Sequence, residues 1–183
     1  MEGVGDSQGG FLKRVASHCQ AHDLPVTVIN KGIGGQSTPD MLARIDELAT
    51  LRPYELVVIL GCNDLPRARD QNPSIRTAPD VYAANLHRIF ATIKGGRSLF
   101  ISSFAVSKER TGISPSLFED YMGAATAIAR SHGYDLWDLF NETKGRTEPW
   151  LADDGLHFND AGHAFIASRV LEWLGPRLPG ADE

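Results

Sequence analysis

Several features that mark large classes of protein are scarce in this sequence. Its 183 residues include only two cysteines, so no disulfide framework is indicated. No window approaches 18 consecutive apolar residues, which argues against a transmembrane helix. Acidic residues outnumber basic ones and the formal net charge is −5, so we expect no nucleic-acid partner. No cluster of His, Cys and carboxylate residues has the spacing of metal ligands, so no metal is expected.

The remaining composition is typical of an ordinary globular protein, with 42% hydrophobic and 22% charged residues. A chain of this length predicts one domain over residues 1–183 with a single sizeable core. Residues 1–5 contain neither a basic region nor an apolar stretch, so no signal peptide is expected and a cytoplasmic location is the default. A missing N-terminal segment would hide such a signal.

Helix-like and strand-like patterns alternate along the chain. Apolar residues recur at helical spacing in 10–22, 38–49, 81–93, 115–131 and 162–174. Short β-branched or apolar runs occupy 25–29, 56–60, 98–102 and 134–136. This alternation predicts an α/β fold with a parallel sheet and helices on both of its faces. Ligands of such sheets bind at the carboxyl ends of the strands.

Two loops predicted at that edge contain residues suited to ester hydrolysis. Gly35 ends a glycine-rich loop after the strand at 25–29, and Asn63 follows the strand at 56–60 directly. The hydrolysis of an ester passes through an oxyanion, which a backbone N–H and a side-chain amide can stabilise. Gly35 and Asn63 are therefore candidate oxyanion-hole donors, and the N–H of the nucleophile itself would be a third.

A second motif, Asp154-Gly155-Leu156-His157, lies near the C-terminal end of the sequence. His157 would act as the general base, and Asp154 would hold its ring in the correct tautomer. Asp153 competes for the second role, but the three-residue spacing to His157 favours Asp154. His163 is assigned a structural role in the first turn of the last helix. The candidate nucleophile is Ser7 in Gly5-Asp6-Ser7-Gln8.

These motifs, taken in order, resemble the four conserved blocks of the SGNH hydrolases, also called the GDSL esterase/lipase family. The blocks are Gly5-Asp6-Ser7, residues 30–37 with Gly35, Gly61-Cys62-Asn63-Asp64, and Asp154-Gly155-Leu156-His157. The resemblance implies a three-layer α/β/α, flavodoxin-like fold and serine-dependent hydrolysis of esters or thioesters without a cofactor. It also implies a triad of Ser7, Asp154 and His157, with Ser7, Gly35 and Asn63 as the oxyanion hole.

The match departs from the family pattern at the N-terminus. In this family the nucleophile follows a central strand, yet only four residues precede Gly5, and strands usually run about five or six residues. Residues 3–11 also resemble a segment that follows the nucleophile in many relatives. Two readings therefore stay open. Either Ser7 is the nucleophile and the first strand is abbreviated, or that strand and the true nucleophile are missing from this chain.

The resulting prediction is a serine esterase that acts on short-chain acyl or acetyl esters of small molecules or sugars. One alternative is a catalytically impaired or non-catalytic protein of the same fold that lacks its nucleophile. Another alternative is an acyltransferase that uses the same triad. The expected partner is a small-molecule ester, and the sequence gives no indication of the oligomeric state.

Overall fold

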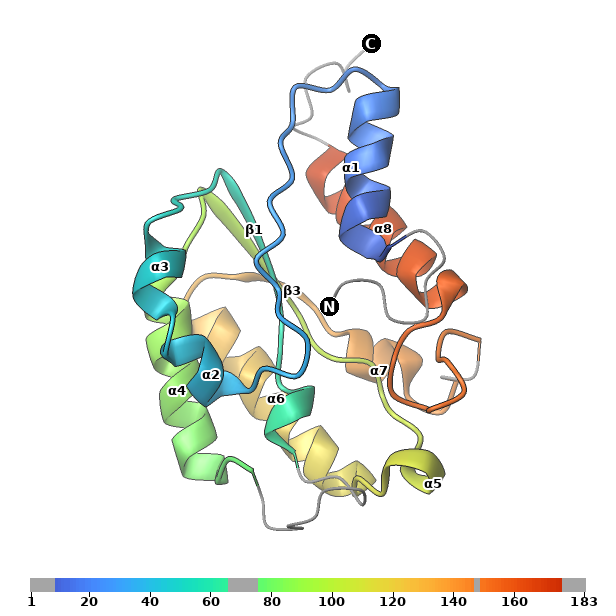
Figure 1. The fold of residues 1–183 in the computed structure, drawn as a ribbon. Helices are drawn as coiled ribbons and strands as arrows, with labels where there is room; N and C mark the ends of the chain where they lie inside the picture. The colour runs from blue at the N-terminus through green and yellow to red at the C-terminus, as the bar shows by residue number, and fades with distance from the viewer. Residues whose placement is uncertain (1–8, 66–75, 147–148, 176–183) are drawn as a thin grey trace. The chain divides into compact units, whose positions relative to one another are not determined.

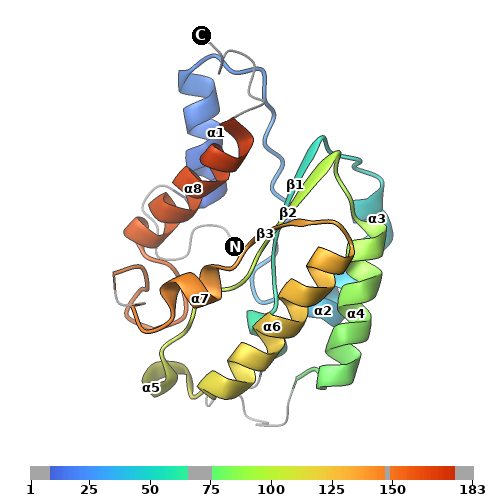
Figure 2. The same cartoon turned by 180° about the vertical axis from the view of Figure 1, so that it is seen from behind.

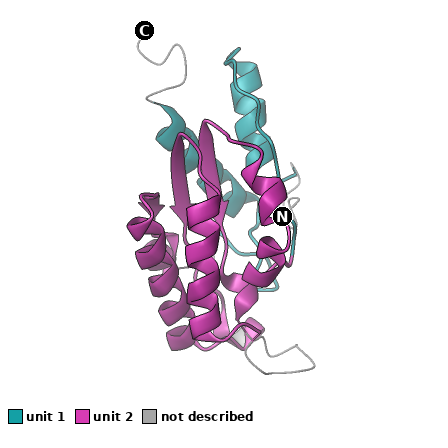
Figure 3. Ribbon diagram, turned by 90° about the vertical axis from the view of Figure 1, so that its left-hand side faces the viewer, with its two compact units in different colours: residues 1–34, 148–183 teal, residues 35–147 magenta. Residues whose placement is uncertain are grey.

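A computed structural model describes residues 9–65, 76–146 and 149–175. Its contacts divide the chain into two compact units, which Figure 3 draws in different colours. Unit 1 comprises residues 1–34 and 148–183, and unit 2 comprises residues 35–147. The single domain expected over residues 1–183 stays a prediction.

Unit 2 contains a parallel sheet of three strands (Figure 1). The strands are β1 (Glu55–Ile59), β2 (Arg97–Ile101) and β3 (Asp135–Trp137), and they pair in the order β1-β2-β3. Val58 of β1 lies opposite Phe100 of β2, which in turn lies opposite Leu136 of β3. The predicted α/β class with a parallel sheet is therefore confirmed.

Two long helices of unit 2, α4 (Pro79–Thr92) and α6 (Pro115–Ser131), pack side by side (Figure 2). Each begins with a proline in its first turn, where the missing N–H has no helical partner to lose. The bounds of α6 are those predicted from the sequence. The described residues of unit 2 also form five short helical segments: α2 (Thr38–Leu42), α3 (Ile45–Ala49), the 3₁₀ segment η1 (Cys62–Asp64), α5 (Lys108–Thr111) and α7 (Leu139–Thr143).

The core of unit 2 forms where the apolar faces of α4 and α6 meet the sheet. Leu86, Ile89 and Phe90 recur at helical spacing on α4 and are fully buried. The Phe90 ring meets the Phe100 ring of β2 edge-on, with 5.3 Å between their centroids. Burying a side chain of this size stabilises the fold by about 1.5–3 kcal/mol, so this layer holds the strands in place.

Unit 1 contains two packed helices, α1 (Phe11–Ala21) and α8 (Asp160–Leu174) (Figure 2). Val15 and Cys19 lie four residues apart on α1 and are both buried. An ion pair of 3.6 Å joins Arg14 of α1 to Asp160 at the start of α8. In the described part of the chain, no helix combines the length and the apolar character needed to cross a membrane.

The strand predicted at residues 25–29 is wrong, because these residues form no strand pairing. A strand needs the N–H and C=O groups of a neighbour. The Val26 N–H instead donates locally to the Leu24 carbonyl, at 2.8 Å, and Ile29 is 62% exposed. The residues have strand propensity, but none of the described strands supplies a partner for them.

A second prediction needs revision. The helix expected over 38–49 is interrupted by a turn at residues 43–44, which separates α2 from α3. Arg44 has a φ of −124° there, outside the helical range.

The sheet of unit 2 ends at β1. The apolar composition of this strand is typical of one with neighbours on both sides, yet β2 is its only partner among residues 9–65, 76–146 and 149–175. The abbreviated or missing first strand stays a prediction.

Gly61, directly after β1, gives a testable consequence of this packing. Its φ is +117°, and an added Cβ would lie 2.5 Å from the Tyr82 hydroxyl and 2.6 Å from the Met122 methyl carbon. We expect Gly61→Ala to lower the free energy of unfolding by about 2 kcal/mol or more, as measured by urea unfolding.

Gly123, inside α6, is the matched control. Nothing lies within 4 Å of an added Cβ at this position, and alanine favours a helix over glycine by about 0.5–1 kcal/mol. Gly123→Ala should therefore stabilise the protein. Equal destabilisation by both variants would contradict this account of Gly61.

Candidate active site

Asp154 and His157 form a direct contact within unit 1. The Nδ1 atom of His157 lies 2.5 Å from Oδ2 of Asp154. Because an ionised carboxylate only accepts hydrogen bonds, Nδ1 carries the proton and Nε2 carries the lone pair. The His157 side chain is 30% exposed, so its ring is open to solvent in part. This is the arrangement that a general base requires.

Backbone contacts within the loop that carries Asp154 and His157 hold the loop in its conformation. The Ala152 N–H donates to the His157 carbonyl at 2.8 Å, and Leu151 and Phe158 form an antiparallel bridge. Gly155 has a φ of +68°, a conformation that glycine adopts without strain. The chain therefore turns back on itself between Ala152 and His157, which brings Asp154 to its partner.

Asn159, at the end of the loop, connects it to α8. Its Oδ1 accepts the Gly162 N–H at 2.9 Å and caps the helix. Its Nδ2 donates to the carbonyls of Pro149 and Leu151, both at 3.1 Å. One side chain therefore ties both ends of the loop to the first turn of α8.

The electrostatics of the pair favour an ionised Asp154. Burial by itself raises the pKa of this carboxyl group. The hydrogen bonds from the His157 ring and from the backbone N–H groups of His157 and Leu156 outweigh burial and lower the pKa to about 2. Both N–H groups lie 2.9 Å from Oδ1. Asp154 is therefore negatively charged near neutral pH and can stabilise a protonated His157 ring.

Asn63 and Gly35, the two predicted oxyanion donors outside the nucleophile, lie in unit 2. Asn63 is in η1, directly after β1, and its Nδ2 donates to the Gln36 carbonyl at 2.9 Å. Gln36 follows Gly35, whose φ is +79°. The structure therefore joins the Asn63 amide to the loop that contains Gly35, although no described strand leads into that loop.

Asp64 supports this part of the site, and the sequence analysis gave it no role. Its side chain is fully buried. The carboxylate accepts the Thr38 N–H on both oxygens at 3.1 Å and the Thr38 hydroxyl on Oδ1 at 2.6 Å. Burial raises the pKa of Asp64, and the bonds from Thr38 oppose that shift. The Asn85 amide in turn donates to the Thr38 hydroxyl at 3.1 Å.

This network fixes residues that follow the two donors in the sequence. Asp64 follows Asn63 directly, and Thr38 lies three residues after Gly35. A carboxyl group in the short turn after an apolar strand was the available signal for Asp64, since a buried charge must be hydrogen-bonded.

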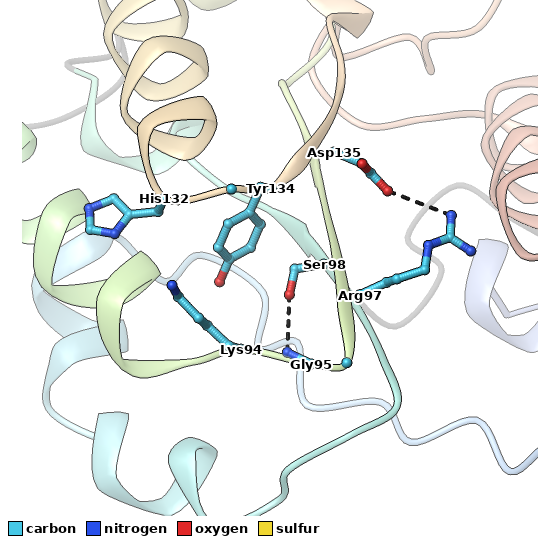
Figure 4. A pocket seen from close by; sticks show the side chains of 9 residues that line it. Lys94, Gly95, Arg97, Ser98, His132, Tyr134 and Asp135 are labelled. Atoms are coloured by element: carbon cyan, nitrogen blue, oxygen red, sulfur yellow. Dashed lines mark hydrogen bonds and ion pairs between the residues drawn. The ribbon is translucent and has the colours of Figure 1, made fainter.

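A separate pocket of about 270 Å³ opens at the amino ends of β2 and β3 (Figure 4). Arg97 at its side forms an ion pair of 3.6 Å with Asp135, and the Ser98 hydroxyl accepts the Gly95 N–H at 3.0 Å. The Tyr134 hydroxyl donates to the Ile93 carbonyl. None of the four predicted site residues that the structure describes lines this pocket, so we assign it no part in the chemistry.

Of the five predicted site residues, Asp154 and His157 are in direct contact, and Asn63 is bonded beside Gly35. Ser7 lies outside the described residues. Among the described residues, no group of three or more His, Cys, Asp or Glu side chains could hold a metal ion.

Comparison with known proteins decides the family. The model of the GDSL-like lipase/acylhydrolase family matches residues 1–165. The chain belongs to this family. Membership makes it a carboxylic ester hydrolase by class, as the sequence predicted, while the roles of individual residues stay predictions.

Similar proteins agree with the family assignment. An arylesterase from Vibrio mimicus is 29% identical over 159 residues, which are 86% of this chain and 74% of the relative. A lipase/acylhydrolase from Enterococcus faecalis matches in structure with a TM-score of 0.77 at 24% identity, covering 92% of this chain and 86% of that one. An acetylxylan esterase from Geobacillus stearothermophilus matches with a TM-score of 0.72 at 22% identity, covering 91% and 81%.

The low pKa of Asp154 predicts how its contribution to stability depends on pH. Its folded-state pKa is about 2, below the unfolded value of about 3.9. The stabilisation is therefore complete above about pH 4 and is lost as the pH falls towards 2. Urea unfolding at several pH values should show that Asp154→Asn costs most near neutral pH and progressively less below about pH 4.

Asp153→Asn, at the exposed neighbouring position, is the control for that measurement. A cost of Asp154→Asn that stays constant from neutral pH down to about pH 3 would contradict the role of the His157 contact.

The buried contact between Thr38 and Asp64 makes a second prediction for this site. Thr38→Val removes the hydroxyl that donates to the carboxylate. Because the carboxylate is buried, we expect the free energy of unfolding to fall by about 1–3 kcal/mol. Thr50→Val removes a hydroxyl from an exposed position and should change it by no more than about 0.5 kcal/mol. Similar costs for the two variants in urea unfolding would count against the network.

Proposed function

We propose that the protein is a serine esterase that hydrolyses short-chain acyl or acetyl esters of small molecules or sugars. The observation that carries the proposal is the contact of 2.5 Å between His157 and Asp154, in a chain that belongs to an acylhydrolase family. An ionised carboxylate on Nδ1 prepares the ring to accept a proton on Nε2.

In the proposed mechanism, the Ser7 hydroxyl oxygen attacks the ester carbonyl carbon while His157 takes the hydroxyl proton. The carbonyl oxygen becomes an oxyanion, which accepts hydrogen bonds from the N–H groups of Ser7 and Gly35 and from the Asn63 amide. Each such donor can be worth about 10²–10³ in rate. His157 then gives its proton to the leaving alcohol, and water hydrolyses the acyl-enzyme by the same sequence of steps.

The names of proteins similar to this chain support the proposed substrate class. One similar protein is an arylesterase, and several similar structures are acetylxylan esterases. These names describe esters with a small acyl group or a small alcohol. The sequence also contains no long contiguous apolar segment of the kind a lipase lid would need, which favours small substrates over lipid aggregates.

Two observations favour a second candidate, a protein of this fold with impaired catalysis. No described strand pairs with the second edge of β1, and residues 25–29 have no strand partner. In that candidate Ser7 is an ordinary loop residue rather than the nucleophile.

A fluorophosphonate probe, which reacts with activated serines, separates the two candidates. We expect a single adduct on Ser7, located by peptide mass spectrometry, and turnover of p-nitrophenyl acetate. Ser7→Ala and His157→Ala should each lower kcat by about 10³-fold or more, because the members of a triad act as a unit. Both measurements are made on protein whose folding is verified by circular dichroism.

Asp154→Asn and Asp153→Asn provide a matched pair in the same loop. The first should lower kcat strongly because it disturbs the His157 tautomer, and the second should leave kcat within about twofold of the parent, as expected of a surface change. Full activity of Ser7→Ala, or the absence of any adduct on folded protein, would favour the second candidate.

A further inference from the structure

His163, on the first turn of α8, accepts a hydrogen bond from a distant backbone group in addition to filling space in the core. Its side chain is buried, with only 2% exposed. Its Nδ1 atom accepts the backbone N–H of Phe11, at 3.2 Å, across 152 residues of sequence. The ring is therefore neutral, with its proton on Nε2.

The two aromatic rings that contact His163 belong to residues close in sequence to two members of the proposed triad. The Phe11 ring stacks on it, with 6.5 Å between the centroids and 13° between the planes. The Phe158 ring meets it edge-on at 5.4 Å. Phe11 lies four residues after Ser7, and Phe158 directly follows His157. All of these contacts lie within unit 1.

The hydrogen bond from Phe11 to His163 satisfies a backbone N–H group that has no acceptor inside α1. Phe11 is the first residue of α1, and the first N–H groups of a helix have no partner inside it. Gly10, at the N-cap, has no side chain with which to satisfy them. His163 therefore acts as a cap supplied by another helix, and it fixes where α1 begins.

We propose that His163 is a positioning residue for ester hydrolysis, because it holds the start of α1, which follows Ser7 by four residues in the sequence, beside Phe158 in the loop that carries His157. The inference rests on the proposed function, because it assumes that Ser7 and His157 are nucleophile and base. His163 itself touches neither the substrate nor the reacting atoms. A displacement of about 1 Å between reacting groups can cost as much as 10²-fold in rate, so loss of this bond should affect kcat.

Two substitutions separate the hydrogen bond from the packing. In His163→Asn, the side-chain oxygen occupies the place of Nδ1 and can still accept the Phe11 N–H. In His163→Leu, an apolar group of similar size occupies it and accepts nothing. We expect kcat to fall by about 10- to 100-fold in the leucine variant, with KM within twofold, and to stay within about threefold of the parent in the asparagine variant.

Hydrogen exchange of the Phe11 amide gives a readout that does not depend on activity. We expect this amide to exchange about tenfold faster or more in His163→Leu and at nearly the parent rate in His163→Asn. If the leucine variant does not fold, Phe11→Pro removes the same N–H from the other side, since proline is tolerated at the first helical position. Phe11→Ala, which keeps the N–H, is its control, and Phe11→Pro should have the lower kcat.

The outcomes distinguish failure of this inference from failure of the proposed function. Equal kcat values for the leucine and asparagine variants, in a protein that Ser7→Ala inactivates, overturn the positioning role alone. Full activity of Ser7→Ala overturns the proposed nucleophile and the positioning role together. In that case faster Phe11 exchange in the leucine variant would identify His163 as a structural cap and nothing more.

Discussion

A buried carboxylate is costly unless hydrogen bonds satisfy it, and Asp64 imposes this requirement on unit 2. It accepts hydrogen bonds from both the N–H and the hydroxyl of Thr38, so the start of α2 is attached to η1, the short segment after β1. Asn63 and Gly35 lie close to these two anchoring points in sequence. The geometry of the predicted oxyanion donors therefore depends on a charge that takes no part in the reaction.

The sequence-based predictions are more accurate for features that depend on residues close in sequence than for features that depend on distant partners. The helix over 115–131 was predicted with its observed bounds, because its apolar periodicity and its initial proline are local signals. The strand at 25–29 was predicted wrongly, since β-branched residues indicate a propensity for strands but not the presence of a partner. The parallel sheet was predictable because alternation of helices and strands leaves few other topologies.

The same distinction applies within the candidate site. The contact between Asp154 and His157 spans three residues, so the motif itself contained it. The contact between Thr38 and Asp64 spans 26 residues, and that between Phe11 and His163 spans 152. No spacing rule connects such positions. The residues proposed to take part in the chemistry were therefore visible in the sequence, whereas the contacts of those proposed to support them required the fold.

The candidate residues are divided between the two units. Asp154 and His157, which would handle the proton, belong to unit 1, and Gly35 and Asn63, which would stabilise negative charge, belong to unit 2. Each pair is held by contacts inside its own unit. Substitutions in the loops around Asn63 leave the residues of the Asp154–His157 contact unchanged, which gives the proposed esterase a route to new ester preferences through unit 2 alone.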